Sequence, residues 1–144
     1  MKEMIQARKE ELQKRGVSGF TLMEMLIVVA IIAVLVAIAI PVMTAQLNNA
    51  KAETDAANIR SGYASANVEI LNGSTATTFG LNKDGSVTVG GAGTYTCAAN
   101  ANDLNDKTQS IGGTAASAIG WTANGTITYT WADDTMTITA TKAS

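Results

Sequence analysis

An uninterrupted apolar run from Met25 to Met43 is the strongest constraint on what this chain of 144 residues can fold into. The run contains no charged residue, and it has the length needed to cross the hydrocarbon core of a bilayer. Glu24 stands directly before it, where an unpaired carboxylate in lipid would cost about 2.5 kcal/mol or more. An account of this protein must therefore explain both a helix suited to a membrane and the carboxylate at its start.

The sequence predicts one long helix from Phe20 to about Leu71. Its first half is apolar on every side, as in a helix buried in a membrane. Pro41 stands inside the pattern and should kink the helix or loosen it locally. Beyond Pro41 the helix becomes amphipathic, with apolar residues at steps of three and four that form one stripe: Leu47, Ala52, Ala56, Ile59, Tyr63, Ala66 and Ile70.

The predicted helix is too long for a small globular protein to enclose. The pair Asn72-Gly73 provides a stop signal, since glycine suits the left-handed position after a helix. At roughly 1.5 Å per residue, a helix ending there is about 78 Å long. About half of it must therefore lie in another environment.

The residues from Ser74 to Ser144 are rich in Thr, Gly, Ala and Asn and predict loops and strands. Near the end, two runs alternate apolar residues with threonines, as half-buried antiparallel strands do: Ile127, Tyr129 and Trp131, then Met136, Ile138 and Ala140. Ser86–Val89 and Thr94–Ala98 are further candidate strands. The predicted class is α+β, a long amino-terminal helix packed on a small antiparallel sheet.

The register of the terminal strands follows from which residues share a face. Trp131 and Met136 share a face if the turn between the two runs is Asp133-Asp134. Ile119 and Trp121 would join that face if an earlier turn is Ala123-Asn124-Gly125, with Gly125 left-handed. The sequence therefore predicts a three-stranded meander whose apolar face covers the helix stripe.

Charge and composition exclude several functions. The first 19 residues hold five basic and three acidic residues (+2), which leaves five basic and nine acidic residues (−4) for the remainder. An acidic distal part argues against direct binding of nucleic acid. The chain has no histidine, so no nucleophile–base pair is evident and we expect no enzyme.

No metal or cofactor is predicted. The single cysteine, Cys97, provides neither an internal disulfide nor a thiolate zinc site, and its alternating context predicts a small buried side chain. The distal aspartates do not follow the spacing of a calcium loop and fit turns instead: Asp103, Asp106, Asp133 and Asp134.

Two simple readings of the amino-terminal half explain it poorly. A cleaved secretory signal could be cut at Ala37-Ile38-Ala39, but the apolar run is too long for one and a cut there would divide a continuous helix. A plain single-span anchor explains the length, but it gives Glu24 no partner.

The run Gly19-Phe20-Thr21-Leu22-Met23-Glu24-Met25-Leu26, followed by apolar residues to Pro41, closely resembles the class III signal of type IV pilins. The resemblance implies a basic leader that stays in the cytoplasm. It also implies a membrane peptidase that cuts between Gly19 and Phe20, and N-methylation of the new Phe20 amine. Gly16 is a second candidate cut site, but the spacing to Glu24 favours Gly19.

The resemblance also gives Glu24 a partner. Cleavage creates a positive amine on Phe20, and in staggered subunits that amine reaches Glu24 of a neighbour. Thr21 and Pro41 match the same assembly segment. The expected organisation is a leader at 1–19, a transmembrane and polymerisation helix at 20–46, and a head at 47–144. The head comprises the amphipathic helix half at 47–71 and the loop and sheet region at 74–144.

The expected function is that of a structural subunit of a type IV pilus-like filament. The implied partners are other copies of the chain, the peptidase and N-methyltransferase, the assembly platform with its ATPase, and the membrane before assembly, with no direct nucleic-acid partner. The implied location is the bacterial cytoplasmic membrane and then the extracellular filament. Two alternatives stay open, a pseudopilin of a type II secretion or DNA-uptake machine and a minor tip pilin that acts as an adhesin.

Overall fold

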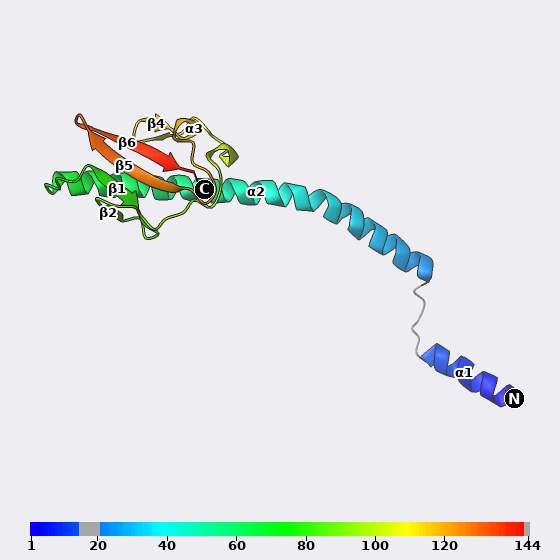
Figure 1. Ribbon diagram of the computed structural model, residues 1–144. Helices are drawn as coiled ribbons and strands as arrows, with labels where there is room; N and C mark the ends of the chain where they lie inside the picture. The colour runs from blue at the N-terminus through cyan, green and yellow to red at the C-terminus, as the bar shows by residue number, and fades with distance from the viewer. Residues whose placement is uncertain (15–20, 143–144) are drawn as a thin grey trace. The chain divides into compact units, whose positions relative to one another are not determined.

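The computed structural model describes residues 1–14 and 21–142, and the chain divides into two compact units, Met1–Val42 and Met43–Ser144. A long helix followed by a small antiparallel sheet confirms the predicted α+β class. The elements in chain order are α1 (Lys2–Lys14), α2 (Leu22–Leu71), β1 (Thr78–Leu81), β2 (Val87–Val89), η1 (Ala101–Asp103), β3 (Ser110–Ile111), β4 (Thr114–Ala115), α3 (Ala116–Ile119), β5 (Thr126–Ala132) and β6 (Thr135–Thr141) (Figure 1).

Helix α2 ends where the sequence predicts. Gly73 takes a left-handed conformation with φ of 88°, which a residue with a side chain adopts only with strain. The amide of Ser74 donates to the carbonyl of Glu69 and that of Gly73 to the carbonyl of Ile70, both at 3.0 Å. This pair of bonds satisfies carbonyls that the end of a helix leaves without partners.

The main sheet is antiparallel, with strand order β2-β1-β5-β6. Strands β5 and β6 form a hairpin in which Trp131 pairs with Met136, as predicted. Its two turn residues, Asp133 and Asp134, have φ of 51° and 58°. Two successive positive φ values are those of a type I′ turn, whose twist matches that of the strands it joins.

The predicted third strand around Ile119 and Trp121 is wrong. Residues 116–119 form the short helix α3, and the second neighbour of β5 is β1, with Phe79 opposite Tyr129. Ile119 and Trp121 are nevertheless buried, with 8% and 1% of their surfaces exposed. The alternation of apolar residues at Ile119 and Trp121 therefore arises because both side chains are buried, one at the end of a helix and the other in a loop. It does not indicate a strand.

Two further details of this region differ from the prediction. The left-handed residue of this turn is Asn124, with φ of 62°, and not Gly125 as the sequence predicts. Residues 94–98 form no strand, although Tyr95 and Cys97 are buried as the alternation suggested. The candidate strand at 86–89 is present as β2.

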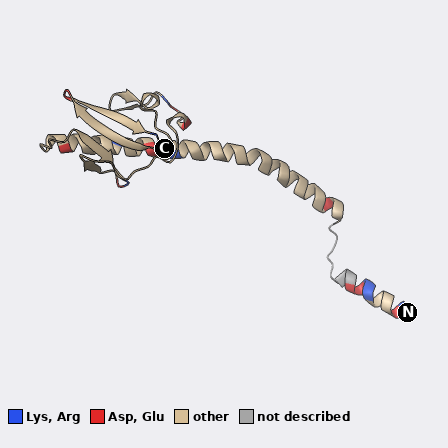
Figure 2. Ribbon diagram, viewed as in Figure 1, with Lys and Arg blue, Asp and Glu red and all other residues tan. Residues whose placement is uncertain are grey.

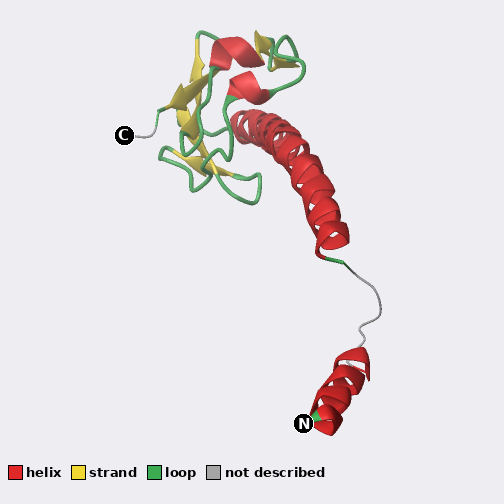
Figure 3. Cartoon of the chain, turned by 90° about the vertical axis from the view of Figure 1, so that its right-hand side faces the viewer, coloured by secondary structure: helices red, strands yellow, loops and turns green. Residues whose placement is uncertain are grey.

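The core of the head lies between the sheet and the carboxyl-terminal part of α2 (Figure 3). The hydroxyl of Tyr129 donates to the carbonyl of Ile59 at 2.7 Å, and its ring meets that of Tyr63 edge-on with centroids 6.5 Å apart. The predicted stripe is buried at its centre and partly buried at Tyr63 and Ile70, but Leu47 is 53% exposed. The fully buried members of the stripe are Ala52, Ala56, Ile59 and Ala66.

A backbone crossing in the head requires glycine. A Cβ atom at Gly80 in β1 would overlap the backbone of residues 91–93, and one at Gly93 would overlap the backbone of Leu81. The crossing is held by the amide of Tyr95, which donates to the carbonyl of Leu81 at 2.9 Å. Two glycines therefore let one segment of the chain lie directly on β1.

We expect Gly80→Ala to destabilise the head by about 1–3 kcal/mol, because the added methyl group meets backbone atoms that have nowhere to move. Gly91→Ala is the matched control, since its new methyl group would lie 3.5 Å from Thr88 Cγ2, an ordinary contact. Thermal unfolding of the full chain in detergent, followed by near-ultraviolet circular dichroism, measures both. Equal unfolding temperatures for the two variants would contradict the close crossing.

Candidate functional site

The start of α2 is capped by its own sequence. Thr21 immediately precedes the helix, and its Oγ1 accepts a hydrogen bond from the backbone amide of Glu24 at 3.3 Å. A threonine hydroxyl in this position satisfies one of the amides that a helix start leaves unpaired. Thr21 and Glu24 thus lie together, whereas Gly19 and Phe20 lie outside the described residues.

Glu24 is the only charged residue between Thr21 and Ala50. Its side chain is exposed in the first turn of α2, where a negative charge is favoured by the positive end of the helix dipole. In Figure 2 this part of α2 carries one acidic position near its start, followed by a long uncharged stretch. The local structure of α2 thus accommodates the carboxylate at the start of the apolar half.

The first half of α2 exposes its apolar side chains on every side. Every large apolar residue from Leu22 to Met43 is between 46% and 85% exposed. Among the described residues, α2 is the one helix long and apolar enough to cross a membrane, and its most apolar 18-residue window has a mean hydropathy of 3.3. A surface of this kind is stable only when lipid or other protein surrounds it.

One face of this half has a shallow apolar depression. Its walls are Ile27, Ile31, Val34 and Leu35, and the small side chain of Ala30 lies among them. These positions follow helical spacing, so they form a single stripe. Such a depression can receive a large side chain from another helix.

Pro41 lies much further along the same helix. The helix continues through it, although proline has no amide hydrogen to donate within the helix. It stands next to the division between the two units, which falls between Val42 and Met43. The weakening expected at Pro41 stays a prediction.

The sequence reasoning missed one residue of the head. Asp55 is not a member of the predicted apolar stripe, but its side chain is fully buried, with 0% of its surface exposed. Its spacing gave a signal, since it lies three residues after Ala52 and four before Ile59, both of which face the core. A carboxylate within a buried stripe requires hydrogen-bond donors around it.

The donors come from the loop after β2. Asp55 Oδ1 accepts a hydrogen bond from the Tyr95 hydroxyl, and the amides of Ala98 and Ala99 donate to Oδ2 at 2.9 Å each. The amide of Ala98 also reaches Oδ1, at 3.0 Å. The carboxylate of one helical residue thereby holds three residues of a distant loop.

This buried network shifts the pKa values of its neighbours. Burial, together with the hydrogen bond to the Asp55 carboxylate, raises the pKa of the Tyr95 hydroxyl well above its ordinary value of 10.0. Burial, with the nearby charge of Asp55, raises the pKa of the Cys97 thiol to about 12. Both groups are therefore neutral at physiological pH, and Cys97, 2% exposed, has little thiolate to react.

In the part of the chain that the structure describes, no three carboxylate, cysteine or histidine side chains gather as metal ligands would. Asp84 and Asp106 instead accept hydrogen bonds within turns, from Ser86 and Thr108 respectively. These bonds lower the pKa values of the two carboxyls.

Comparison with known proteins identifies the amino-terminal region. A family model described as the prokaryotic N-terminal methylation motif matches residues 14–40, a range that includes Gly19, Phe20, Thr21 and Glu24. The type IV narrow pilus major component PilA5 of Thermus thermophilus is 50% identical to this chain over 54 residues. Its amino-terminal region is similar to that of type IV pilins. The resemblance drawn from the sequence is thereby confirmed.

The likeness to PilA5 is partial. It covers 35% of this chain and 47% of the relative, so the chain spans about half the length of the relative that it matches. No solved structure matches the chain.

We expect Asp55→Asn to destabilise the head by about 1–3 kcal/mol. The NH2 group of the asparagine would face the Tyr95 hydroxyl or the amides of Ala98 and Ala99, which are themselves donors, so hydrogen bonds would be lost. Release of this loop should also speed the reaction of Cys97 with a thiol reagent at pH 8, measured on the full chain in detergent.

Glu53→Gln is the control for this substitution, since Glu53 is an exposed carboxylate on the same helix. It should leave both the unfolding temperature and the rate of Cys97 labelling unchanged. If Asp55→Asn also left both unchanged, the carboxylate would not be what holds the loop.

Proposed function

We propose that the chain is a structural subunit of a type IV pilus-like filament, made as a precursor, cut between Gly19 and Phe20, and polymerised through α2. One observation carries the proposal. The first half of α2 is an exposed apolar helix with a single carboxylate at its start, and its residues 22–40 lie within the stretch that matches the methylation motif. In this reading the helix is first surrounded by lipid and then by the same helix of other subunits.

Glu24 sets the register of assembly in this proposal. Cleavage after Gly19 leaves a positive amine on Phe20, one helical turn before Glu24. An ion pair within one chain would not explain why both charges are present in the membrane, since neither would be needed there. A pair between staggered subunits neutralises both charges only when the helices dock in register.

The remaining features of α2 support packing between subunits. The depression at Ala30 can receive a side chain from a neighbouring helix, as small residues at helix interfaces do. Pro41 removes one helical hydrogen bond at the end of the exposed apolar half, which favours local melting as the helix leaves the bilayer. Thr21 holds the first turn, so the Glu24 backbone is fixed before docking.

The partners follow from this life cycle. The leader at 1–19 stays in the cytoplasm, where its basic end favours that orientation. A prepilin peptidase cuts it and an N-methyltransferase modifies Phe20, after which the assembly platform and its ATPase extract the subunit into an extracellular filament. The role is structural and not catalytic.

The name of the relative bears on which filament this is. PilA5 is a major component of a narrow pilus, which favours a pilus subunit over a secretion pseudopilin or a tip adhesin for this chain. We propose that this chain likewise makes up the body of its filament.

We expect the mature subunit to begin at Phe20 and to have 144 − 19 = 125 residues. Gly19→Val should leave the full-length precursor in the membrane, because a branched side chain does not fit a site that selects glycine. Intact mass and amino-terminal sequencing of the membrane fraction and of sheared filaments measure this. Filament subunits that begin at Val17 would show that the cut follows Gly16 instead.

We expect Glu24→Gln to be inserted and cut normally but to yield few or no filaments, because the Phe20 amine of each neighbour loses its charged partner. Electron microscopy of sheared filaments, with the subunit mass from the membrane, separates assembly from processing. When expressed beside the normal subunit, the variant should be incorporated sparsely, since it still contributes its own amine.

Glu53→Gln is the matched control, because it removes an exposed carboxylate from α2 outside the apolar half. It should assemble normally. Abundant, normal filaments from the Glu24→Gln chain alone would refute a role of this carboxylate in assembly register.

A further inference from the structure

Strand β6 is the longer of the two edge strands of the main sheet. It lies last in the order β2-β1-β5-β6 and has seven residues, Thr135–Thr141, whereas β2 at the opposite edge has three. An edge strand presents backbone donors and acceptors that can pair with another strand. The length of β6 makes it the stronger candidate for such pairing.

The turn geometry fixes which backbone groups of β6 face outward. In a two-residue hairpin, the pair that flanks the turn, here Ala132 and Thr135, exchanges hydrogen bonds, and such pairs then alternate along the ladder. The odd-numbered residues of β6 therefore bond to β5. On β5, the amide of Trp131 donates to the carbonyl of Thr77 on the other side, which agrees with this alternation.

The backbone groups of Met136, Ile138 and Ala140 consequently face the free edge. Within the described residues 1–14 and 21–142, none of these three forms a backbone hydrogen bond outside the β5–β6 ladder. Their side chains point to the buried face, and the threonines between them are exposed on the other. The edge thus offers a row of amides and carbonyls on a strand without charge.

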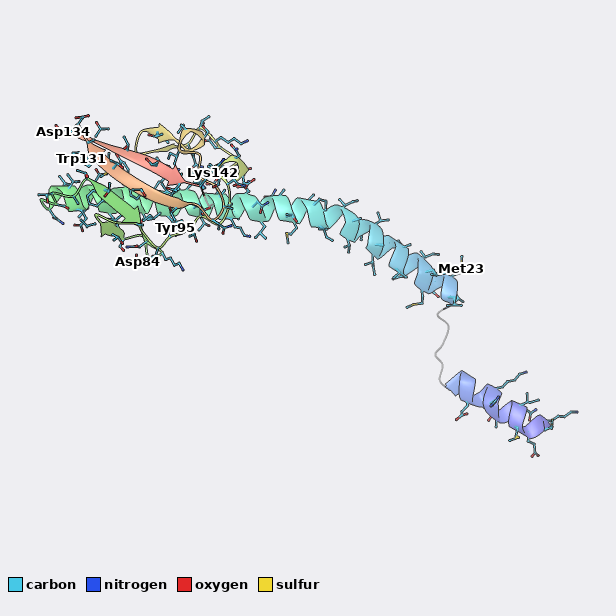
Figure 4. All side chains as sticks on the ribbon, in the orientation of Figure 1. Met23, Asp84, Tyr95, Trp131, Asp134 and Lys142 are labelled. Atoms are coloured by element: carbon cyan, nitrogen blue, oxygen red, sulfur yellow. The ribbon has the colours of Figure 1, made fainter. Side chains whose placement is uncertain are left out.

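Charge is found only at the two ends of this edge. Asp133 and Asp134 form the turn before β6, and Lys142 directly follows its last residue. Figure 4 shows Asp134 and Lys142 at opposite ends of the strand. All three residues are exposed. A strand with acidic residues at one end and a basic residue at the other is complementary to itself when the two copies run antiparallel.

We propose that β6 pairs with β6 of a second copy of this chain, antiparallel and centred on Ile138. This register places Ile138 opposite Ile138 of the second copy and Met136 opposite Ala140 of the second copy. The outward-facing backbone groups of the two strands then bond to one another. It also places Lys142 opposite Asp134 of the second copy, at both ends of the paired strands. Exposed opposite charges across a strand pair favour this register over its neighbours.

The symmetry of this contact determines where it operates. Both copies use the same surface, so the contact closes on itself as a two-fold pair. Successive subunits of one helical filament are related by a repeated rotation and translation instead, and they cannot all use such a contact. The pairing therefore links heads from two different filaments, or two precursors in one membrane, and it goes beyond the proposed function.

Cysteine cross-linking of the full-length chain in detergent tests the register. In it, Thr137 lies opposite Thr139 of the second copy in a non-hydrogen-bonded pair, with Cα atoms about 4.5 Å apart, within reach of a disulfide. A mixture of Thr137→Cys and Thr139→Cys chains, oxidised with diamide, should give a cross-linked dimer at least about tenfold more than either variant alone. Each variant alone places its thiols on a diagonal of about 7–8 Å.

The unmodified chain controls for Cys97, which is buried and should not cross-link. The register would be overturned if the mixture and both single variants cross-linked equally. It would also be overturned if the mixture did not cross-link at a concentration where size-exclusion chromatography shows dimers. A chain that remains monomeric up to millimolar concentration would overturn the pairing itself.

A charge exchange provides the second test. The same mixture of Thr137→Cys and Thr139→Cys chains is used, with the charge change made in both chains. Lys142→Glu alone or Asp134→Lys alone should reduce cross-linking severalfold, and the two changes together should restore it. Failure of the double change to restore it, with circular dichroism unchanged, would contradict the Lys142–Asp134 pairing. Because these measurements need neither cleavage nor filaments, their outcome is independent of the filament proposal, which the Glu24→Gln experiment tests separately.

Discussion

The buried carboxylate of Asp55 joins helix α2 to the loop after β2. It is the one charged side chain in the core among the described residues, and it accepts hydrogen bonds from Tyr95, Ala98 and Ala99. The loop that donates these bonds directly follows residues 91–93, which cross β1 at Gly80. The position of the loop and the position of the segment that lies on β1 therefore depend on the same carboxylate. A core this small and rich in alanine thus gains a fixed arrangement from polar bonds in addition to apolar packing.

Helix α2 has two surfaces with opposite requirements. From Ala52 to Ala66 its small side chains let the sheet approach closely, and the protein itself provides the cover. From Leu22 to Met43 the large apolar side chains are exposed in the part of the chain that the structure describes. The difference in side-chain size along one helix therefore separates the part that packs against the sheet from the part whose apolar surface is exposed.

The sequence predicted those parts of the fold that depend on residues close together in the chain. The length and end of α2, the Asp133-Asp134 turn and the pairing of Trp131 with Met136 follow from periodicity and turn chemistry within a few residues. The partner of β5 could not be found this way, because β1 lies far earlier in the chain and contains Gly80, whose role depends on a distant glycine. Asp55 was missed because residue type outweighed spacing, although spacing alone placed it in the stripe.

The order in which the sheet closes follows from its connectivity. Strands β5 and β6 are joined by two residues, so their hairpin can form within microseconds. Phe79 and Tyr129, which pair in β1 and β5, are 129 − 79 = 50 residues apart, and closing a loop of that size has a larger entropic cost. We expect the hairpin to form first and β1 to join it late. Until then the apolar edge of a half-formed sheet stays exposed, which makes the interval before closure the stage most vulnerable to aggregation and proteolysis.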